Sequence, residues 1–257
     1  LSPDPAALEP PYTVSLRILA IDMGTGTQDI LVFDAAQQVE NSVKLVMPSA
    51  TEVAARRIRR AHAAGRKLVL TGTVAGGGPC SWALEDFLKA GGAAFATPEA
   101  AQTIDDDLDR VRELGVTLVS EDEAASIDGD RVVLQDLDIG AIRAALSAFE
   151  VPGDFDGFAL GCLDHGAAPP DVSDRVFRFE HLRRVVEGRN DLLAFATDAS
   201  ALPHYLTRAR AMCGSAAGQG PVVFMDTGPA AALGALHDER VGGAAESLVM
   251  NLGNMHL

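Results

Sequence analysis

The sequence predicts an α/β fold that is built on a mixed sheet with helices on both of its faces. Apolar runs typical of strands open the chain as a meander, and later runs alternate with segments of helical apolar spacing. The 257 residues, 47% of them hydrophobic, suffice for one large or two small domains without a disulfide or metal staple.

The first elements are expected to form a meander of three strands. Residues 1–16 hold four prolines and are expected to form a flexible N-terminal arm. The runs Ile18–Ile21 and Asp29–Asp34 predict a hairpin, because a short Gly/Thr segment joins them. Ser42–Met47 is expected to add the third strand.

A helix is predicted next, with Thr51 as its N-cap and Gly65 at its end. Its solvated face is expected to carry Arg56, Arg57, Arg59 and Arg60. Further strands are expected at residues 67–71, 93–96, 116–119, 131–134, 158–163, 222–225 and 248–250. Further helices are expected at residues 81–90, 105–115, 139–149, 204–213 and 230–237.

The charge balance narrows the range of partners. The chain has 36 acidic and 21 basic residues, a net charge of −15, so its field repels a phosphodiester backbone and an anionic membrane. We expect no nucleic-acid partner and no membrane partner. The three cysteines lie far apart in sequence, and no basic region followed by an apolar core opens the chain. These observations favour a cytoplasmic location.

The segment Ile21–Asp29 carries the strongest functional signal. A carboxylate at the end of a buried strand, followed by glycines and threonines, is typical of a phosphate and magnesium site. Asp22 is the candidate metal ligand and catalytic carboxylate. The candidate phosphate-binding residues are Gly24, Thr25, Gly26, Thr27 and Gln28. The alternative is a glycine-rich hairpin turn with a capping aspartate.

This segment resembles the first phosphate motif of the superfamily that contains actin, the sugar kinases and the seventy-kilodalton heat-shock chaperones. Pro229–Leu236 is similar to the helix that links the two lobes in the chaperones, and Leu248–Asn254 falls where their second phosphate motif stands. The resemblance implies ribonuclease-H-like lobes, each of the form β-β-β-α-β-α-β-α, with ATP and Mg²⁺ held between them.

The same resemblance implies a division of the chain. Residues 17–240 would form an enlarged first lobe with an insertion at residues 116–150, and residues 248–257 would begin a truncated second lobe. Either residues 93–96 or residues 222–225 could supply the fifth strand of the first lobe. We prefer 222–225, because that run leads directly into the second phosphate motif.

The second motif departs from the superfamily pattern. Asn251 stands where a carboxylate is usual and Asn254 where a glycine is usual, with Gly253 between them. These three residues remain candidates for nucleotide binding. The loss of the carboxylate is expected to weaken metal positioning, so binding without fast hydrolysis becomes plausible. The chaperones also carry a glutamate just before the helix that Pro229–Leu236 resembles. Here Asp226 offers a carboxylate close by but out of register, and the resemblance makes it a candidate catalytic residue.

Three further segments, Gly76–Pro79, Asp164–Gly166 and Asp174–Glu180, carry a second resemblance. With them, the whole chain is most similar to an uncharacterised prokaryotic family that is often labelled pyruvate formate-lyase activating enzyme-like. A glycyl-radical activase needs a three-cysteine motif for its iron–sulfur cluster, and Cys80, Cys162 and Cys213 provide no such motif. We therefore do not expect radical chemistry from this chain.

Two further segments are candidate sites. The loop of Gly76, Gly77 and Gly78 precedes Pro79 and a predicted helix, whose first amide groups could bind an anion; a tight strand-to-helix connection is the alternative. Asp164 and His165 follow a predicted strand and could form an acid–base dyad. A lone histidine is, however, more often a structural group.

Three hypotheses about function follow. The first is a nucleotide-binding protein, a Mg²⁺-dependent ATPase or phosphotransferase acting on an unknown small molecule or protein partner. The second is a regulatory module that binds nucleotide or another ligand without catalysis. The third is an enzyme that uses Asp164 and His165 beside the loop from Gly76 to Pro79.

Overall fold

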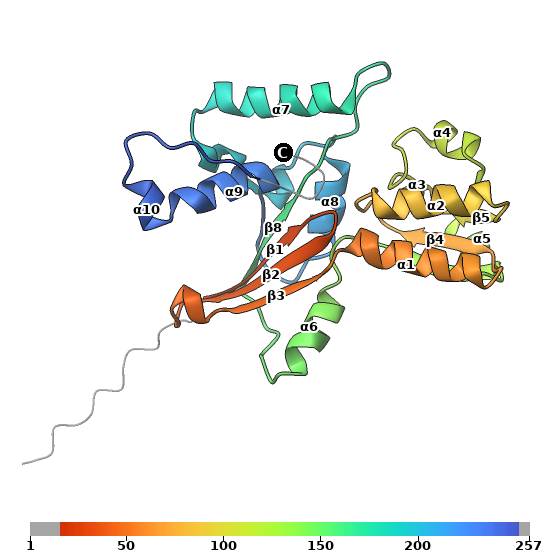
Figure 1. The fold of residues 1–257 in the computed structure, drawn as a ribbon, viewed down its shortest axis with the longest axis horizontal. Helices are drawn as coiled ribbons and strands as arrows, with labels where there is room; N and C mark the ends of the chain where they lie inside the picture. Colours follow the sequence, from red (N-terminus) through yellow and green to blue (C-terminus); the bar gives the residue numbers. More distant parts are fainter. Residues whose placement is uncertain (1–15, 252–257) are drawn as a thin grey trace, which may run out of the picture.

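The structure, a computed structural model, describes residues 16–251. Two β-sheets lie side by side in it, one mixed with six strands and one parallel with four (Figure 1). The chain begins in the six-stranded sheet, passes into the four-stranded sheet and returns. The predicted mixed α/β fold with helices on both faces is therefore confirmed.

The six-stranded sheet begins with the predicted meander. Its strands are β1 (Arg17–Met23), β2 (Thr27–Asp34), β3 (Val43–Pro48), β8 (Gly157–Cys162), β9 (Thr197–Asp198) and β10 (Val222–Phe224), with the short 3₁₀ helix η1 (Val39–Asn41) before β3. They lie in the order β3-β2-β1-β8-β10-β9. The meander is antiparallel, β8 and β10 run parallel to β1, and β9 is an antiparallel edge.

The four-stranded sheet is made by the chain between β3 and residue 135. Its elements are α1 (Ala50–Ala63), β4 (Leu68–Gly72), α2 (Pro79–Lys89), β5 (Ala94–Ala96), α3 (Pro98–Ala101), α4 (Leu108–Glu113), β6 (Val116–Leu118), α5 (Glu121–Ser126) and β7 (Asp130–Leu134). The strands are parallel, in the order β6-β5-β4-β7. Of the two candidates for a fifth strand, residues 222–225 supply β10 of the first sheet and residues 93–96 supply β5 of this second sheet.

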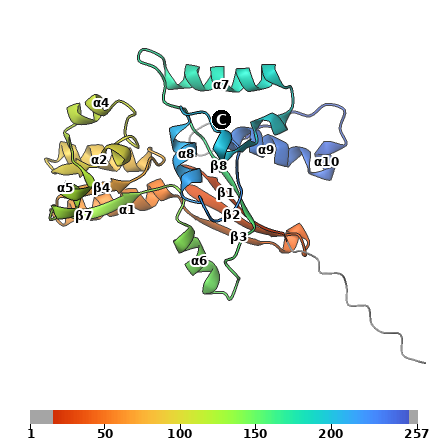
Figure 2. The same ribbon diagram turned by 180° about the vertical axis from the view of Figure 1, so that it is seen from behind.

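The remaining helices surround the six-stranded sheet. They are α6 (Ile139–Ser147), α7 (Asp174–Gly188), η2 (Leu192–Phe195), η3 (Ala199–Ala201), α8 (Thr207–Gly214), α9 (Thr227–Leu236) and α10 (Glu239–Gly242). Helix α6 lies on one side of the sheet, and α7, α8 and α9 lie on the other in both views (Figures 1 and 2). Among the described residues, no helix combines the length and the apolar character that a bilayer crossing requires.

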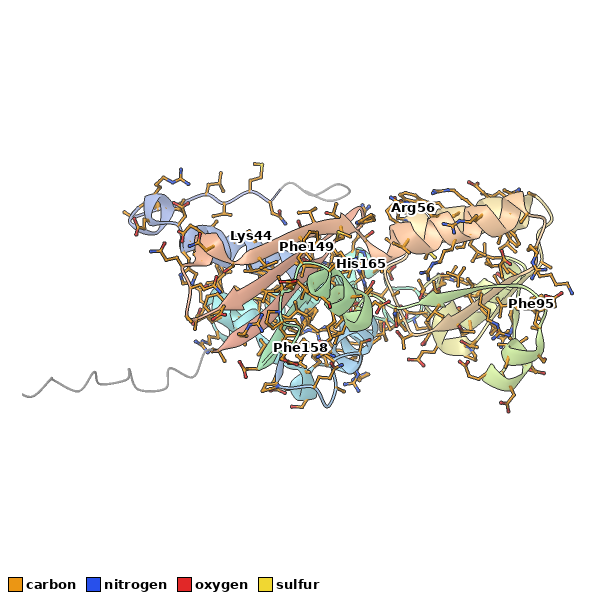
Figure 3. All side chains as sticks on the ribbon, turned by 90° about the horizontal axis from the view of Figure 1, so that it is seen from below. Lys44, Arg56, Phe95, Phe149, Phe158 and His165 are labelled. Carbon is orange, nitrogen blue, oxygen red and sulfur yellow. The ribbon has the colours of Figure 1, made fainter. Side chains whose placement is uncertain are left out.

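Each sheet has its own hydrophobic core. Leu19, Phe158 and Met212 belong to the core of the six-stranded sheet, which α6 and α8 help to cover (Figure 3). Ile58 and Leu84 belong to the core of the four-stranded sheet, which α1 and α2 cover. The molecule therefore contains two separately packed units. Hydrogen bonds between polar side chains, such as that of Arg208 to Asp136, cross the boundary between them.

Some sequence predictions differ from the structure. Ser49, and not Thr51, is the N-cap of α1: its side chain accepts a hydrogen bond from the amide of Glu52, while Thr51 is buried in the first turn. Residues 248–250 form no strand, because Leu248 and Met250 are largely exposed and no described strand pairs with them.

The basic cluster of α1 agrees with the prediction. All four arginines of this helix are exposed, and Figure 3 shows Arg56 on its outer surface. The predicted insertion at residues 116–150 spans β6, α5, β7 and α6. Its boundaries stay a prediction.

Candidate functional site

A pocket of about 1130 Å³ opens between the two sheets. Its walls are the hairpin turn after β1, the glycine loop after β4, the segment after β8 and the start of α9. Sequence-predicted residues in these walls are Asp22, Gly24, Thr25, Thr27, Gly76, Gly77, Gly78, Asp164, His165 and Asn251. Gly26, Gln28 and Asp226 are not among the residues that line it, and Gly253 and Asn254 lie outside the described residues.

Asp22 is the next-to-last residue of β1 and lines this pocket. It lies directly opposite Asp29 in the antiparallel pair of β1 and β2, where two like charges are unfavourable. The Thr227 hydroxyl donates a hydrogen bond to Asp22 Oδ1 at 2.6 Å. Burial, with a smaller contribution from the charge of Asp29, raises the pKa of Asp22 above its usual value. A cation beside this pair would relieve the unfavourable charge.

The hairpin turn is fastened from behind. Its own closing hydrogen bond runs from the Gly24 amide to the Thr27 carbonyl at 2.9 Å. Ser49 Oγ donates to the Thr25 carbonyl at 2.6 Å, and the Ser49 amide donates to the Gly26 carbonyl at 3.1 Å. Gln28 takes no part in the pocket, because its side-chain amide donates to the Pro48 carbonyl at 2.9 Å and joins β2 to β3.

The glycine loop is held by buried polar side chains. The Gly76 amide donates to Asp136 Oδ1 at 3.0 Å, and a β-carbon at residue 76 would lie 2.6 Å from Arg208 Nη2. Gly78 has a φ of +57°, in the region that favours glycine. The backbone and packing of the loop therefore require Gly76 and Gly78, independently of any ligand.

Backbone groups at the start of α2 are also hydrogen-bonded within the protein. Thr51 Oγ1 donates to the Gly77 carbonyl and accepts a hydrogen bond from the Cys80 amide at 3.0 Å. The amides of Gly76 and Cys80 are thus bonded within the protein and are not available to an anion. Gly77, Gly78 and Ser81 remain in the pocket wall.

Sequence reasoning missed the buried ion pair of Asp136 and Arg208. Asp136 follows β7, Arg208 lies on α8, and Arg208 Nε donates to Asp136 Oδ2 at 2.6 Å. The Asp136 side chain is 1% exposed, so loss of Arg208 would leave a buried carboxylate without a counter-charge. Arg208 also donates to the Leu163 carbonyl at 2.7 Å, which connects the glycine loop to the end of β8.

Asp164 and His165 follow β8, as predicted, and line the same pocket as the glycine loop. Asp164 is buried, and its two oxygens accept hydrogen bonds from the amides of Gly166 at 2.8 Å and Ala209 at 2.9 Å. Burial nevertheless raises its pKa above the usual value. Asp164 therefore fixes the segment after β8, and Figure 3 shows His165 between the two sheets.

Asp226 is engaged in an ion pair outside the pocket. Arg178 of α7 donates to both of its oxygens, at 2.7 Å for the pair of Nη2 and Oδ1. Asp226 also caps α9, because Oδ1 accepts a hydrogen bond from the Gly228 amide at 3.1 Å. Its carboxylate is already bound on both oxygens, which argues against the catalytic role that its position in the sequence had favoured.

Further acidic side chains line the pocket. They are Asp105, Asp106, Asp107, Asp171 and Asp174. Arg110 lies 3.7 Å from Asp105 and 3.8 Å from Asp107. Desolvation, followed by the charges of Asp164, Asp105 and Asp174, raises the pKa of Asp106 to about 6, although the residue as a whole is exposed. The run of three aspartates at 105–107 was the available sequence signal.

The pocket does not contain a complete set of protein ligands for a metal. Within residues 16–251, no group of three or more His, Cys, Asp or Glu side chains is placed to hold an ion. Mg²⁺ commonly binds through one or two carboxylates and completes its shell with water and substrate phosphates. Asp22 and Asp29 fit that pattern as a pair and not as a cage.

Comparison with known proteins gives one match. A family model described as "Putative pyruvate format-lyase activating enzyme (DUF1786)" matches residues 75–257, more than two thirds of the chain. The chain belongs to this family. No curated protein and no solved structure matches it.

Proposed function

We propose that this DUF1786 protein binds the phosphates of a nucleotide together with Mg²⁺ in the pocket between its two sheets, on an actin-like core. The order of elements in the six-stranded sheet supports the proposal. The meander β1 to β3 is followed in this sheet by α6, β8, α8, β10 and α9, which fits the ribonuclease-H-like pattern that the sequence resemblance implies. The elements α7, η2, β9 and η3, between β8 and α8, are additions to that pattern. The four-stranded sheet would then be an insertion between β3 and α6.

The observation that carries the proposal is the pair of opposed carboxylates beside the hairpin turn. Asp22 and Asp29 face each other across the hairpin, and Gly24, Thr25 and Thr27 line the adjoining wall. This arrangement attracts a divalent cation. The cation in turn attracts phosphate, which the other aspartates that line the pocket would repel. Mg²⁺ bound there would supply charge neutralisation for the phosphates.

The state of the remaining carboxylates favours binding over rapid hydrolysis. Asp226 is paired with Arg178, and Asn251, which lines the pocket, carries an amide in place of a carboxylate. A hydrolytic enzyme needs a group that orients or deprotonates the attacking water. We therefore propose slow or absent turnover, which joins the first two hypotheses of the sequence analysis.

The family description does not change this proposal. Three cysteines would have to meet to hold the iron–sulfur cluster of a radical activase. Cys80 lies in the core of the four-stranded sheet, whereas Cys162 and Cys213 lie in the core of the six-stranded sheet. Burial also raises the pKa of Cys80 to about 12, which disfavours the thiolate that a metal requires. The residues present do not fit such a cluster.

The third hypothesis, an acid–base enzyme, finds less support. Asp164 and His165 do line the pocket with the glycine loop. Both oxygens of Asp164 are, however, occupied by backbone amides. His165 would then have to act without the free carboxylate that the dyad requires.

Isothermal titration calorimetry tests the proposed function. We expect the purified protein to bind Mg·ATP, to lose that binding when EDTA removes the metal, and to bind about tenfold or more weakly as Asp22→Asn. Asp154→Asn, an exposed aspartate remote from the pocket, should leave affinity unchanged. Absence of binding of Mg·ATP and Mg·ADP at millimolar concentration would overturn the proposal.

A turnover assay separates binding from hydrolysis. Wild-type protein should release phosphate from Mg·ATP slowly or not at all, and Asn251→Asp should raise that rate if a carboxylate at residue 251 is the missing group. An ordinary catalytic rate in the wild type would contradict the regulatory hypothesis and support an ATPase.

A further inference from the structure

The first turn of α1 is the place where the two loops of the pocket are joined. Ser49 is completely buried, and it fastens the hairpin turn through two hydrogen bonds to the carbonyls of Thr25 and Gly26. The same hydroxyl caps α1 by accepting from the Glu52 amide at 3.3 Å. Ser49 is thus bonded to the turn and to the helix at once.

These two bonds also orient the amides of the turn. In a trans peptide the N–H points opposite to the C=O of the same unit. The carbonyls of Thr25 and Gly26 point to Ser49, so the amides of Gly26 and Thr27 point away from it. Of these two residues, Thr27 lines the pocket, so its amide is the donor that suits a phosphate oxygen.

Thr51 holds the glycine loop as Ser49 holds the hairpin turn. Its hydroxyl donates to the Gly77 carbonyl and accepts from the Cys80 amide, so it holds both the loop and the start of α2. Thr51 is 4% exposed. Two buried hydroxyls, two residues apart in one helical turn, therefore each hold one wall of the pocket.

The two walls also lie close to each other. A β-carbon at Gly78 would lie 3.3 Å from the methyl group of Thr25. A larger side chain at residue 78 would therefore press on the hairpin turn.

We propose that Ser49 and Thr51 are positioning residues that hold the hairpin turn and the glycine loop as one phosphate-binding surface. The proposal rests on the proposed function, because it assigns the two hydroxyls to the same nucleotide site. Neither residue has to touch the ligand. Each acts through the loop whose backbone it holds.

Four variants and one control test the proposal. Ser49→Ala and Thr51→Val remove one hydroxyl each, and Ser49→Thr and Thr51→Ser restore it in a different side chain. Asp138→Ala is the matched control, because Asp138 caps α6 through the Ala141 amide and does not line the pocket. It loses a side-chain helix cap of the same kind that is bonded to neither loop of the pocket.

Affinity for Mg·ATP and for Mg·pyrophosphate is the first readout. We expect Ser49→Ala and Thr51→Val to weaken both ligands roughly fivefold or more, the loss of about one net hydrogen bond in positioning. Ser49→Thr and Thr51→Ser should recover most of the affinity, and Asp138→Ala should bind as the wild type does. Equal binding by all variants would overturn the proposal, as would an equal loss in Asp138→Ala.

Amide hydrogen exchange without ligand is the second readout. Ser49→Ala should speed exchange in a peptide spanning residues 22–30, and Thr51→Val in a peptide spanning residues 74–82, while Asp138→Ala changes neither. If wild-type protein bound neither probe, the proposed function would fail, and exchange alone would decide whether the two hydroxyls hold the loops. Unchanged exchange in both peptides would overturn the positioning role.

Discussion

Arg208 determines which residue can stand at position 76. Its guanidinium bonds Asp136 and the Leu163 carbonyl, and it occupies the space that a β-carbon at Gly76 would need. Asp136 follows a strand of the four-stranded sheet and Leu163 a strand of the six-stranded sheet, so Arg208 bonds to both units. A single arginine thus explains one glycine of a loop that looks, in sequence, like a ligand-binding motif.

Gly76→Ala should destabilise the protein by about 1–3 kcal/mol, because the new methyl group displaces Arg208 from a buried ion pair. Denaturant unfolding measures the change. Gly234→Ala is the control: nothing lies within 4 Å of its β-carbon, and alanine in a helix should be neutral or stabilising by up to about 1 kcal/mol. Equal stability of the wild type and Gly76→Ala would contradict this account.

Asp106 should make stability depend on pH. Its folded-state pKa of about 6 lies above the ordinary 3.8, so the folded state binds more protons between these values and loses stability as the pH rises through them. Asp106→Asn should therefore gain melting temperature relative to the wild type as the pH rises from about 4 to about 6. Thermal melts of the two proteins across this range check it, and a difference in melting temperature that does not change with pH would contradict it.

Residues of the candidate site were predictable from sequence only where the signal is local. Asp22, Gly24 and Thr25 belong to one strand and its turn, and all three line the pocket. Ser49 contacts a turn 24 residues away, and Arg208 contacts an aspartate 72 residues away. Such pairs leave no periodic pattern, because strand pairing creates the first and contact between the two sheets creates the second.

At the level of elements, apolar periodicity predicted most of the strands and helices. The meander and the alternation after it follow from buried faces that repeat every two or every 3.6 residues. Helix α7 had no such signal, since none of its residues is buried. The sequence analysis did not predict α7, nor the short helices α3, α5 and α10 or the edge strand β9.

The attachment of α7 depends on a few polar contacts. Arg178 bonds Asp226 and the Asp164 carbonyl, and the ring of Phe177 packs against that of Tyr205. A helix without buried side chains contributes little to the core. We therefore expect it to open locally before the sheet unfolds.

Arg178→Ala should expose α7 to protease. We expect cleavage between residues 171 and 196 to become about five- to thirtyfold faster, the equivalent of 1–2 kcal/mol of local stability, while both sheets stay intact. Limited proteolysis with mass spectrometry measures this. Arg183→Ala, which loses only an exposed pair with Glu187, should behave as the wild type does. Slower or unchanged cleavage in Arg178→Ala would show that other contacts hold the helix.

At the scale of the whole molecule, the two cores can be probed separately through their cysteines. All three thiols are buried, with Cys80 in one core and Cys162 and Cys213 in the other. Alkylation under native conditions, normalised to the unfolded chain, should give one opening rate for Cys80 and a different one for the other two. A single common rate would show that both cores unfold as one unit.

The division into two sheets was only partly visible in the sequence. The alternation of strands and helices predicts an α/β fold, but it does not say which strand joins which sheet. The runs at 93–96 and 222–225 look alike, and the structure places them in different sheets. Their assignment depends on which neighbours bury them, and that is a property of the folded molecule.

The position of the pocket at the junction has a mechanical consequence. The chain crosses between the sheets at residues 48–50 and 135–138, beside the walls that Ser49 and Asp136 hold. Helix α1 begins at the first of these crossings and runs for 14 residues, roughly 20 Å. Because α1 packs in the core of the four-stranded sheet, its direction fixes how that sheet projects from the pocket. A change in the angle between the two sheets would therefore displace the far end of α1 more than the pocket walls.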